Sequence, residues 1–337
     1  MVLSLHPAAA ATRWLAIAFA TVLFAAGNFL HAEDLLKAGP PVILKGTHGK
    51  FDFLAIDAEG RRLLAAHTGN GSLDVIDLDK HELVKSVATG AAQASAVNAA
   101  AGQYLVAVSK PPQVVLVDSA KLEPVAKIPL SGPADLITFN PKSGLAYVDH
   151  DDATNLWVVN PKDSKVESSI ELRGEGPEDL GFDAADERLF QSIKKANAVV
   201  VIDLATGKVG ASWPTAPAEA PHGMAFLPED HAFLVAGGNG KLVMMSERDG
   251  HVLSSTDIPA RVDQIAFDHG LHRVYCASGT GKIGVVKLEG GQLTTLGEVA
   301  SSAGCHSITV DPKTHTVWIA YAKDEQSMVQ PFAPATK

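Results

Sequence analysis

The sequence lacks several features that would assign it to a common class of nucleic-acid-binding protein. Aromatic residues make up only 6% of the chain, and 28 lysine and arginine residues are outnumbered by 38 aspartate and glutamate residues. The basic residues are scattered, and their longest run is Lys194-Lys195. Phosphate recognition needs clustered basic residues, and single strands need stacking aromatics. The composition therefore argues against nucleic acid as a partner.

Recognisable catalytic motifs are also lacking. The chain contains no G-x-S-x-G, no H-E-x-x-H, no phosphate-cradling glycine loop and no C-x-x-C-H haem-attachment motif. The sequence shows no nucleophile with an identifiable base, so it leaves the catalytic residues unknown. The sequence favours a protein that is not an enzyme and leaves the question open.

Cysteine is scarce, with only Cys276 and Cys305 in the chain. Two cysteines allow a single intramolecular disulfide, which an oxidising compartment would permit. The two residues fall in different repeats of the pattern described below, one in mid-strand and one at the start of an innermost strand. That separation favours two thiols over a bridge, although both alternatives remain open.

Long apolar runs are lacking except near the N-terminus. Arg13 precedes the apolar run 14–26, and a short stretch of small and polar residues ends at Ala32. This order is typical of a secretory signal peptide cleaved after Ala32, and the run is short for a membrane span of about 20 residues. We predict that residues 1–32 are a signal peptide and that the mature chain, 33–337, is periplasmic or secreted. An uncleaved N-terminal anchor is the alternative.

What the chain does contain is a repeat. Seven segments share one pattern and read FDFLAID, QASAVN, DLITFN, EDLGFD, HGMAFL, DQIAFD and HSITVD, closing at Asp57, Asn98, Asn140, Asp183, Leu227, Asp268 and Asp311. Their closing residues are 41 to 44 positions apart. A period near forty built from short alternating β segments predicts a β-propeller in which each repeat is one blade.

The repeat therefore predicts an all-β fold, a seven-bladed β-propeller with four-stranded antiparallel blades in one domain, 33–337. Each repeat contains three β-rich runs and a weaker fourth, separated by turns rich in Gly, Asp, Asn and Pro. The seventh repeat ends after Phe332 without a fourth run. We expect the segment PVILK, residues 41–45, to supply the missing outer strand and close the ring, which removes free sheet edges.

The repeat also carries a family resemblance. Inner segments ending in A-[IVF]-[DN] and the run VVVIDLATGKV, residues 199–209, resemble the YVTN repeat. Seven such repeats after a signal peptide resemble the YncE-type exported propellers. The resemblance implies a seven-bladed exported protein, and it also implies single-stranded DNA binding, which the acidic composition makes the least favoured function.

One column of the repeat alignment is polar in all seven copies. Five positions before each closing residue stand Asp52, Gln93, Asp135, Glu178, His222, Asp263 and His306. This position opens the innermost strand, so in a closed ring the seven side chains surround one mouth of the central channel. We predict a ligand-binding site there.

Part of this column has the chemistry of a metal site. Carboxylates and imidazoles are common ligands of divalent cations, and closely placed carboxylates repel unless a cation or shared protons offset them. We predict His222, His306, Asp52 and Glu178 as metal ligands, with no other cofactor expected. Two alternatives remain open: the column solvates a water-filled channel, or it bonds to loops of neighbouring blades.

Other polar residues are peripheral to this prediction. His67 and His150 end second strands on the same face and would extend the pocket, or they are ordinary polar loop residues. The run Asp149–Asp152 lacks the spacing of a calcium loop. A further set ends third strands, where such side chains cap tight turns, and comprises Asp77, Asp118, Asn160 and Asp203.

These observations favour a periplasmic binding or scaffold protein that holds a small ligand, a metal ion or a protein partner at the channel mouth. We expect a monomer without a membrane span after signal cleavage. The alternative is a hydrolase or lactonase-like enzyme at the same place, with one or two of Asp52, Glu178, His222 and His306 as general acid–base groups. That alternative predicts a carboxylate with a perturbed pKa.

Overall fold

The computed structural model describes residues 1–2, 35–150, 152–183, 185 and 187–335. Apart from Met1 and Val2, the predicted signal peptide lies outside the described residues. Within the described part of the chain, no helix combines the length and apolar character that a bilayer crossing requires.

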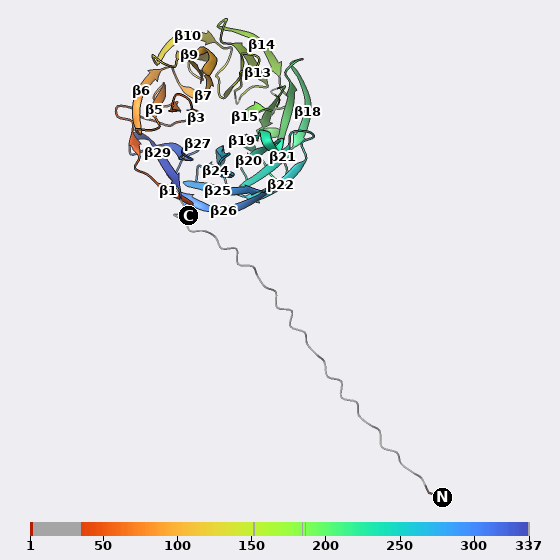
Figure 1. Cartoon of the computed structure of the whole chain (residues 1–337). Helices are drawn as coiled ribbons and strands as arrows, with labels where there is room; N and C mark the ends of the chain where they lie inside the picture. The colour runs from red at the N-terminus through yellow and green to blue at the C-terminus, as the bar shows by residue number, and fades with distance from the viewer. Residues whose placement is uncertain (3–34, 151, 184, 186, 336–337) are drawn as a thin grey trace.

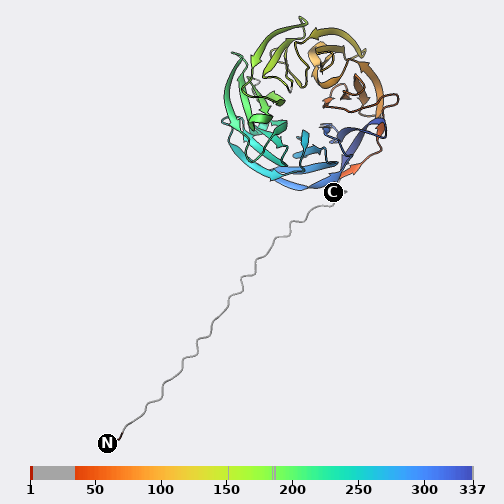
Figure 2. The same ribbon diagram turned by 180° about the vertical axis from the view of Figure 1, so that it is seen from behind.

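The chain forms seven antiparallel sheets arranged as blades around a common centre (Figures 1 and 2). The first blade contains β3 (Leu54–Asp57), β4 (Arg62–His67), β5 (Ser72–Asp77) and β6 (Glu82–Ala88), and the second contains β7 (Ala92–Asn98), β8 (Gln103–Val108), β9 (Gln113–Asp118) and β10 (Glu123–Pro129). The third contains β11 (Ile137–Asn140), β12 (Leu145–Val148), β13 (Asn155–Asn160) and β14 (Lys165–Glu171), and the fourth contains β15 (Pro177–Phe182), β16 (Arg188–Ile193), β17 (Ala198–Asp203) and β18 (Lys208–Pro214). The fifth contains β19 (Pro221–Leu227), β20 (Ala232–Gly237), β21 (Lys241–Ser246) and β22 (Val252–Asp257), and the sixth contains β23 (Val262–Asp268), β24 (Arg273–Ser278), β25 (Lys282–Glu289) and β26 (Gln292–Ala300). The seventh combines β27 (Ser307–Val310), β28 (Val317–Lys323) and β29 (Gln326–Pro334) with β1 (Leu36–Ala38) and β2 (Val42–Ile43). The predicted seven-bladed propeller is confirmed.

The apolar content of each blade falls from its middle strands to its outer strand. In β9, Val114–Val117 are essentially inaccessible, because neighbouring blades cover both faces of the sheet. In β14 every residue except Ile170 is exposed. The hydrophobic effect therefore holds the blades together face to face, and the outer strands tolerate the polar residues that weakened their signal in the sequence.

The ring closes through both ends of the chain, as predicted. Strand β2 pairs with Met328 and Val329 of β29, which places the segment 41–45 on the last blade. The pairing also extends further than predicted, because β1 continues it along the C-terminal half of β29. Figures 1 and 2 show β1 beside β29 at the rim. Arg61 of the first blade adds a side-chain link to Asp311 of the seventh, with two contacts of 2.7 Å.

The predicted turn-capping role of the strand-ending Asx residues is confirmed. Asp77 Oδ1 accepts hydrogen bonds from the backbone nitrogens of Asp79 and Lys80, and Asp203 Oδ1 accepts one from Thr206. The closing residues of the inner strands behave alike, and Asp57 Oδ1 accepts from the nitrogen of Gly60 at 2.8 Å. These residues are explained by turn geometry.

Candidate metal centre at the channel mouth

The polar column of the repeat lies where the innermost strands begin. Asp52, Asp135 and His306 directly precede or stand near the first residues of β3, β11 and β27, while the other members occupy the second position of their strands. Because all seven strands run in the same direction along the channel, these positions lie at one mouth. The structure groups five of the seven residues more closely than the others: Asp52, Glu178, His222, Asp263 and His306.

These five residues form two overlapping donor groups. In one group, single donor atoms of Asp52, Asp263 and His306 lie within 4.8 Å of one another. In the other, donor atoms of Glu178, His222 and Asp263 meet the same limit. Asp263 belongs to both, so it is central to the site. The sequence prediction of metal ligands did not include Asp263, because one aligned column gives no distances across the ring.

Both histidines of the site have one ring nitrogen occupied by the backbone. His222 Nδ1 lies 2.7 Å from the carbonyl oxygen of Ala220, and His306 Nδ1 lies 2.9 Å from that of Gly304. A carbonyl oxygen can only accept, so Nδ1 carries the hydrogen in each ring. The neutral imidazole then has its lone pair on Nε2, the arrangement that metal-bound histidines usually show.

The local backbone explains how these carbonyls reach the rings. Ala220 and Gly304 have left-handed backbone conformations, with φ of 47° and 81°. In this conformation the chain reverses just before the inner strand, and the carbonyl of the left-handed residue turns toward the side chain two positions later. Gly304 adopts this φ without strain, whereas Ala220 carries a small cost.

Glu178 has a lysine side chain within hydrogen-bond distance of its carboxylate. It is 7% exposed, and its Oε1 lies 2.6 Å from Lys194 Nζ and 3.8 Å from His222 Nε2. The ammonium group offsets the carboxylate charge and competes with any cation for the same oxygen. An ion bound by Glu178, His222 and Asp263 would therefore have to compete with Lys194 for Glu178.

Gln93 and Asp135 lie outside both donor groups. The side-chain amide of Gln93, with its nitrogen turned toward Thr68 Oγ1 at 2.8 Å, also reaches Asp52 Oδ2 at 3.2 Å. Gln93 therefore orients Asp52. Asp135 donates its backbone N–H to the carbonyl oxygen of Asp149 at 2.9 Å. Within the described residues, neither belongs to a set of three donor atoms close enough for one ion.

A further carboxylate, that of the half-buried Asp179, follows Glu178 directly in the chain. Burial raises the pKa of Asp179 to about 7, hydrogen bonds from the backbone nitrogens of Met224 and Leu180 lower it, and the charge of Asp263 raises it. The sequence alone did not indicate Asp179, because only its neighbours from other blades, Met224 and Asp263, distinguish it from surface aspartates.

A cavity of about 320 Å³ opens at this mouth. It is lined by His222, Gly238, Arg261, Val262, Asp263, Gly279, Gly304 and His306. The only apolar side chain of this lining is that of Val262. The space is therefore small and polar, with imidazole, carboxylate and guanidinium groups on its wall.

His67 and His150 contribute to packing in the structure. His67 is inaccessible and stacked on Phe51, with Nδ1 2.6 Å from Asp74 Oδ2 and Nε2 3.2 Å from the carbonyl oxygen of Gly49. With both ring nitrogens engaged, it has no lone pair for a metal ion. His150 is stacked on Trp157, with ring centroids 4.9 Å apart.

Both cysteines are free, buried thiols. Burial raises the pKa of Cys305 to about 12 and also raises that of Cys276. Cys305 precedes His306, but its thiol is protonated at neutral pH and its Sγ donates toward the carbonyl oxygen of Ser307 at 3.8 Å.

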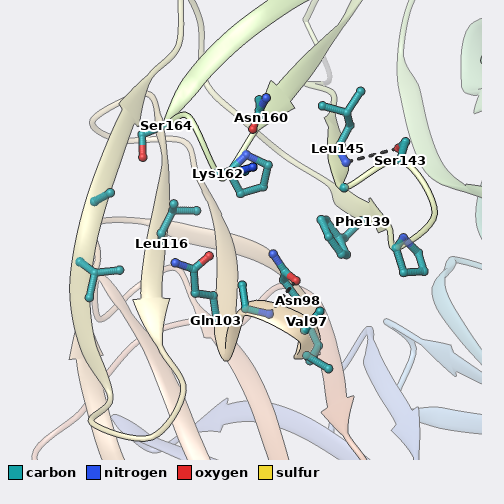
Figure 3. A pocket seen from close by; sticks show the side chains of 18 residues that line it. Val97, Asn98, Gln103, Leu116, Phe139, Ser143, Leu145, Asn160, Lys162 and Ser164 are labelled. Carbon is teal, nitrogen blue, oxygen red and sulfur yellow. Dashed lines mark hydrogen bonds between the residues drawn. The ribbon is translucent and has the colours of Figure 1, made fainter.

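A larger cavity lies away from this site. It has a volume of about 1130 Å³ and occupies the seam between the second and third blades, at the end of the ring where the inner strands finish (Figure 3). Ala146 stands there at the register position that Tyr104 fills in the preceding seam, where the tyrosine hydroxyl reaches Asp57. Asn98 and Asn160 on its wall are engaged in their own turns. The seam is an open packing groove without converging charged groups.

Comparison with known proteins gives a partial family match. Residues 48–211, just under half of the chain, match the profile of the cytochrome D1 heme domain. No curated protein matches.

Solved structures confirm the fold. The chain is similar to Kuenenia stuttgartiensis hydrazine synthase, with 16% identity, a TM-score of 0.70 and coverage of 85% of this chain and 98% of that one. It is also similar to the WD40 repeats of RRP9, with 8% identity, a TM-score of 0.74 and coverage of 88% and 100%. U3-55K gives 9% identity, a TM-score of 0.75 and coverage of 88% and 99%. At these identities the likeness shows the architecture alone.

The residues at the channel mouth do not fit a haem. The profile match ends before β19, so it excludes His222, Asp263 and His306. Cofactor pockets are lined mainly by apolar and aromatic side chains, whereas this cavity is polar and has Val262 as its only apolar side chain. Its donor atoms suit a single ion.

Proposed function

We propose that this protein is an exported, YncE-type propeller that binds a divalent transition-metal ion at its channel mouth and acts as a periplasmic binding protein. Asp263, Asp52 and His306 are the principal ligands, and His222 and Glu178 form the adjoining part of the site. Oxygen and imidazole donors together suit zinc and neighbouring transition metals better than calcium or magnesium, which prefer oxygen alone.

The observation that carries this proposal is the state of the two histidines. Nδ1 of each ring donates to a backbone carbonyl, which leaves the Nε2 lone pair as the metal donor. His306 belongs to the group with Asp52 and Asp263, and His222 belongs to the adjoining group with Glu178 and Asp263. A channel that only needed solvation would not require two oriented imidazoles. A bound cation would also offset the repulsion between Asp52 and Asp263.

Metal content of the untagged protein tests the proposal. We expect near-stoichiometric zinc or another transition metal by mass spectrometry after dialysis, and loss of the metal from a His222→Ala/His306→Ala variant. A His251→Ala/His269→Ala variant is the matched control, because both of these side chains are exposed and lie outside the donor groups. Metal-free protein whose unfolding temperature does not rise with added Zn²⁺ or Co²⁺ would refute the metal site.

A hydrolase or lactonase-like activity is the second candidate, and the perturbed pKa of Asp179 favours it. A carboxyl group with a pKa of about 7 can act as a general acid or base at neutral pH. If this candidate is correct, an Asp179→Asn variant should lose hydrolysis of simple lactones while keeping its metal, since Asp179 is not a member of the donor groups. Absence of lactone hydrolysis by the metal-loaded wild type would remove this candidate.

A further inference from the structure

Arg261 places a guanidinium on the wall of the cavity that also holds His222, Asp263 and His306. Its backbone is held on both sides, because its nitrogen donates to the carbonyl oxygen of Gly238 at 3.1 Å and its carbonyl oxygen accepts from the nitrogen of Gly279 at 3.0 Å. Its Nη2 lies beside Gly279. The backbone of Arg261 is therefore held at the rim of the candidate metal centre, and its side chain is exposed there.

The backbone conformation at Arg261 is unfavourable for an arginine. Its φ is 59°, in the left-handed region that glycine adopts freely. The same position, two residues before the polar column, is also left-handed in three other blades, at Gly176, Ala220 and Gly304. These blades use small residues at this turn, so the turn itself does not need a long side chain. A strained arginine at such a turn points to a role for its guanidinium.

The guanidinium does not neutralise the nearby carboxylates. Among the described residues it makes no hydrogen bond and no ion pair, although the chain carries a net charge of −10 and Asp263 lines the same cavity. With a metal ion at Asp52, Asp263 and His306, the cavity would contain two cationic groups. An anion between them would be attracted by both.

The cavity has room for such an anion because three of its lining residues are glycines. Gly238, Gly279 and Gly304 present no side chains to the opening. Residues Asp52, Asp263 and His306 would fill three positions of a four-coordinate ion and leave one open, as in zinc sites that bind a small ligand. The volume of about 320 Å³ limits that ligand to a small molecule.

We propose that the channel mouth binds a small oxyanion, a carboxylate or a phosphate group, between the metal ion and Arg261. This inference rests on the proposed metal site. One oxygen of the anion takes the open position on the ion, and the guanidinium donates two parallel N–H bonds to the same group. The ligand of the propeller is thus a small acid or phosphate ester.

The test uses the full protein loaded with Co²⁺, whose visible absorption changes when a ligand enters its coordination shell. Inorganic phosphate and acetate are titrated separately into the wild type and an Arg261→Gly variant. We expect spectral saturation with at least one anion in the wild type and an affinity lower by about tenfold or more in the variant, the usual effect of losing charged hydrogen bonds. A response to one probe alone identifies the ligand as a carboxylate or as a phosphate.

Arg261→Gly removes the side chain without straining the backbone, because glycine adopts the left-handed conformation of this turn freely. It should keep or raise the unfolding temperature and keep Co²⁺ binding, so a loss of anion binding cannot be attributed to misfolding. Arg248→Ala, at an exposed turn outside the cavity, controls for the change in net charge. Bound Co²⁺ with no anion response, or equal anion affinity in the wild type and Arg261→Gly, overturns the oxyanion site and leaves the metal site standing. Failure to bind Co²⁺ overturns both.

Discussion

An Arg61→Ala substitution is expected to lower the free energy of unfolding by about 3 kcal/mol at pH 7, because it breaks a buried ion pair at the closure of the ring. Arg61 contacts both carboxylate oxygens of Asp311 at 2.7 Å, and Asp311 is only 1% exposed. Its other partner, Asp79, is 56% exposed and contributes little. Urea unfolding at neutral pH measures this loss.

The loss should depend on pH in a defined direction. Burial raises the pKa of Asp311, but the hydrogen bonds from Arg61 and Thr314 outweigh this effect and lower the pKa from 3.8 to about 2. A lowered native pKa means that the ionised pair stabilises the fold above the unfolded pKa and that this contribution disappears as the pH falls from about 4 to 2. The difference in the free energy of unfolding between the wild type and Arg61→Ala should therefore be constant above about pH 5 and smaller at pH 3.

Two variants distinguish loss of the ion pair from other effects of the substitution on the contact between the first and seventh blades. Arg61→Ala/Asp311→Asn should recover part of the lost stability, since it no longer leaves a buried carboxylate without its guanidinium. Arg248→Ala removes an exposed positive charge elsewhere and should change stability little. An equal difference in the free energy of unfolding between the wild type and Arg61→Ala at pH 3 and pH 7 would contradict the ionic explanation.

The sequence was sufficient to predict the architecture because the repeat and the fold have the same period. Each blade needs one polar turn and two buried strands, and this requirement recurs every 41 to 44 residues. The closure by residues 41–45 followed from the missing outer strand of the last repeat. The pairing of β1 with β29 was missed because Leu36–Ala38 is too short to show an alternating pattern.

The sequence was less informative about the site because the repeat alignment gives the position of each residue along its strand. It gives no distances between residues of different blades. The aligned column contained all five grouped donors, but only the ring geometry shows that Asp263 is shared and that Glu178 is paired with Lys194. The burial of His67 and the raised pKa of Asp179 depend on how the surrounding strands pack. Arg261 was missed because it lies outside the column and its strained φ is not visible in sequence.

Substituting Asp263 by asparagine is expected to weaken binding of Zn²⁺ or Co²⁺ by about 100-fold or more, since even outer-shell changes around metal sites cost 10–100-fold. Asp263 supplies a donor atom to both groups, so the substitution replaces a charged oxygen donor of each group by a neutral one. Glu178→Gln is the matched comparison. It should weaken binding by less than about tenfold, because Lys194 already holds that carboxylate. Isothermal titration calorimetry gives both affinities directly.

Stability measurements distinguish a metal site from a merely polar channel. Without metal, Asp263→Asn should be at least as stable as the wild type, because it removes a negative charge near Asp52 and Asp179. With metal at about 100 times its dissociation constant, the wild type should gain about 2.7 kcal/mol and the variant far less. Opposite orders of stability with and without metal are expected only if the carboxylates are gathered to hold a cation. If Asp263→Asn is less stable than the wild type both with and without metal, Asp263 stabilises the fold and is not a metal ligand.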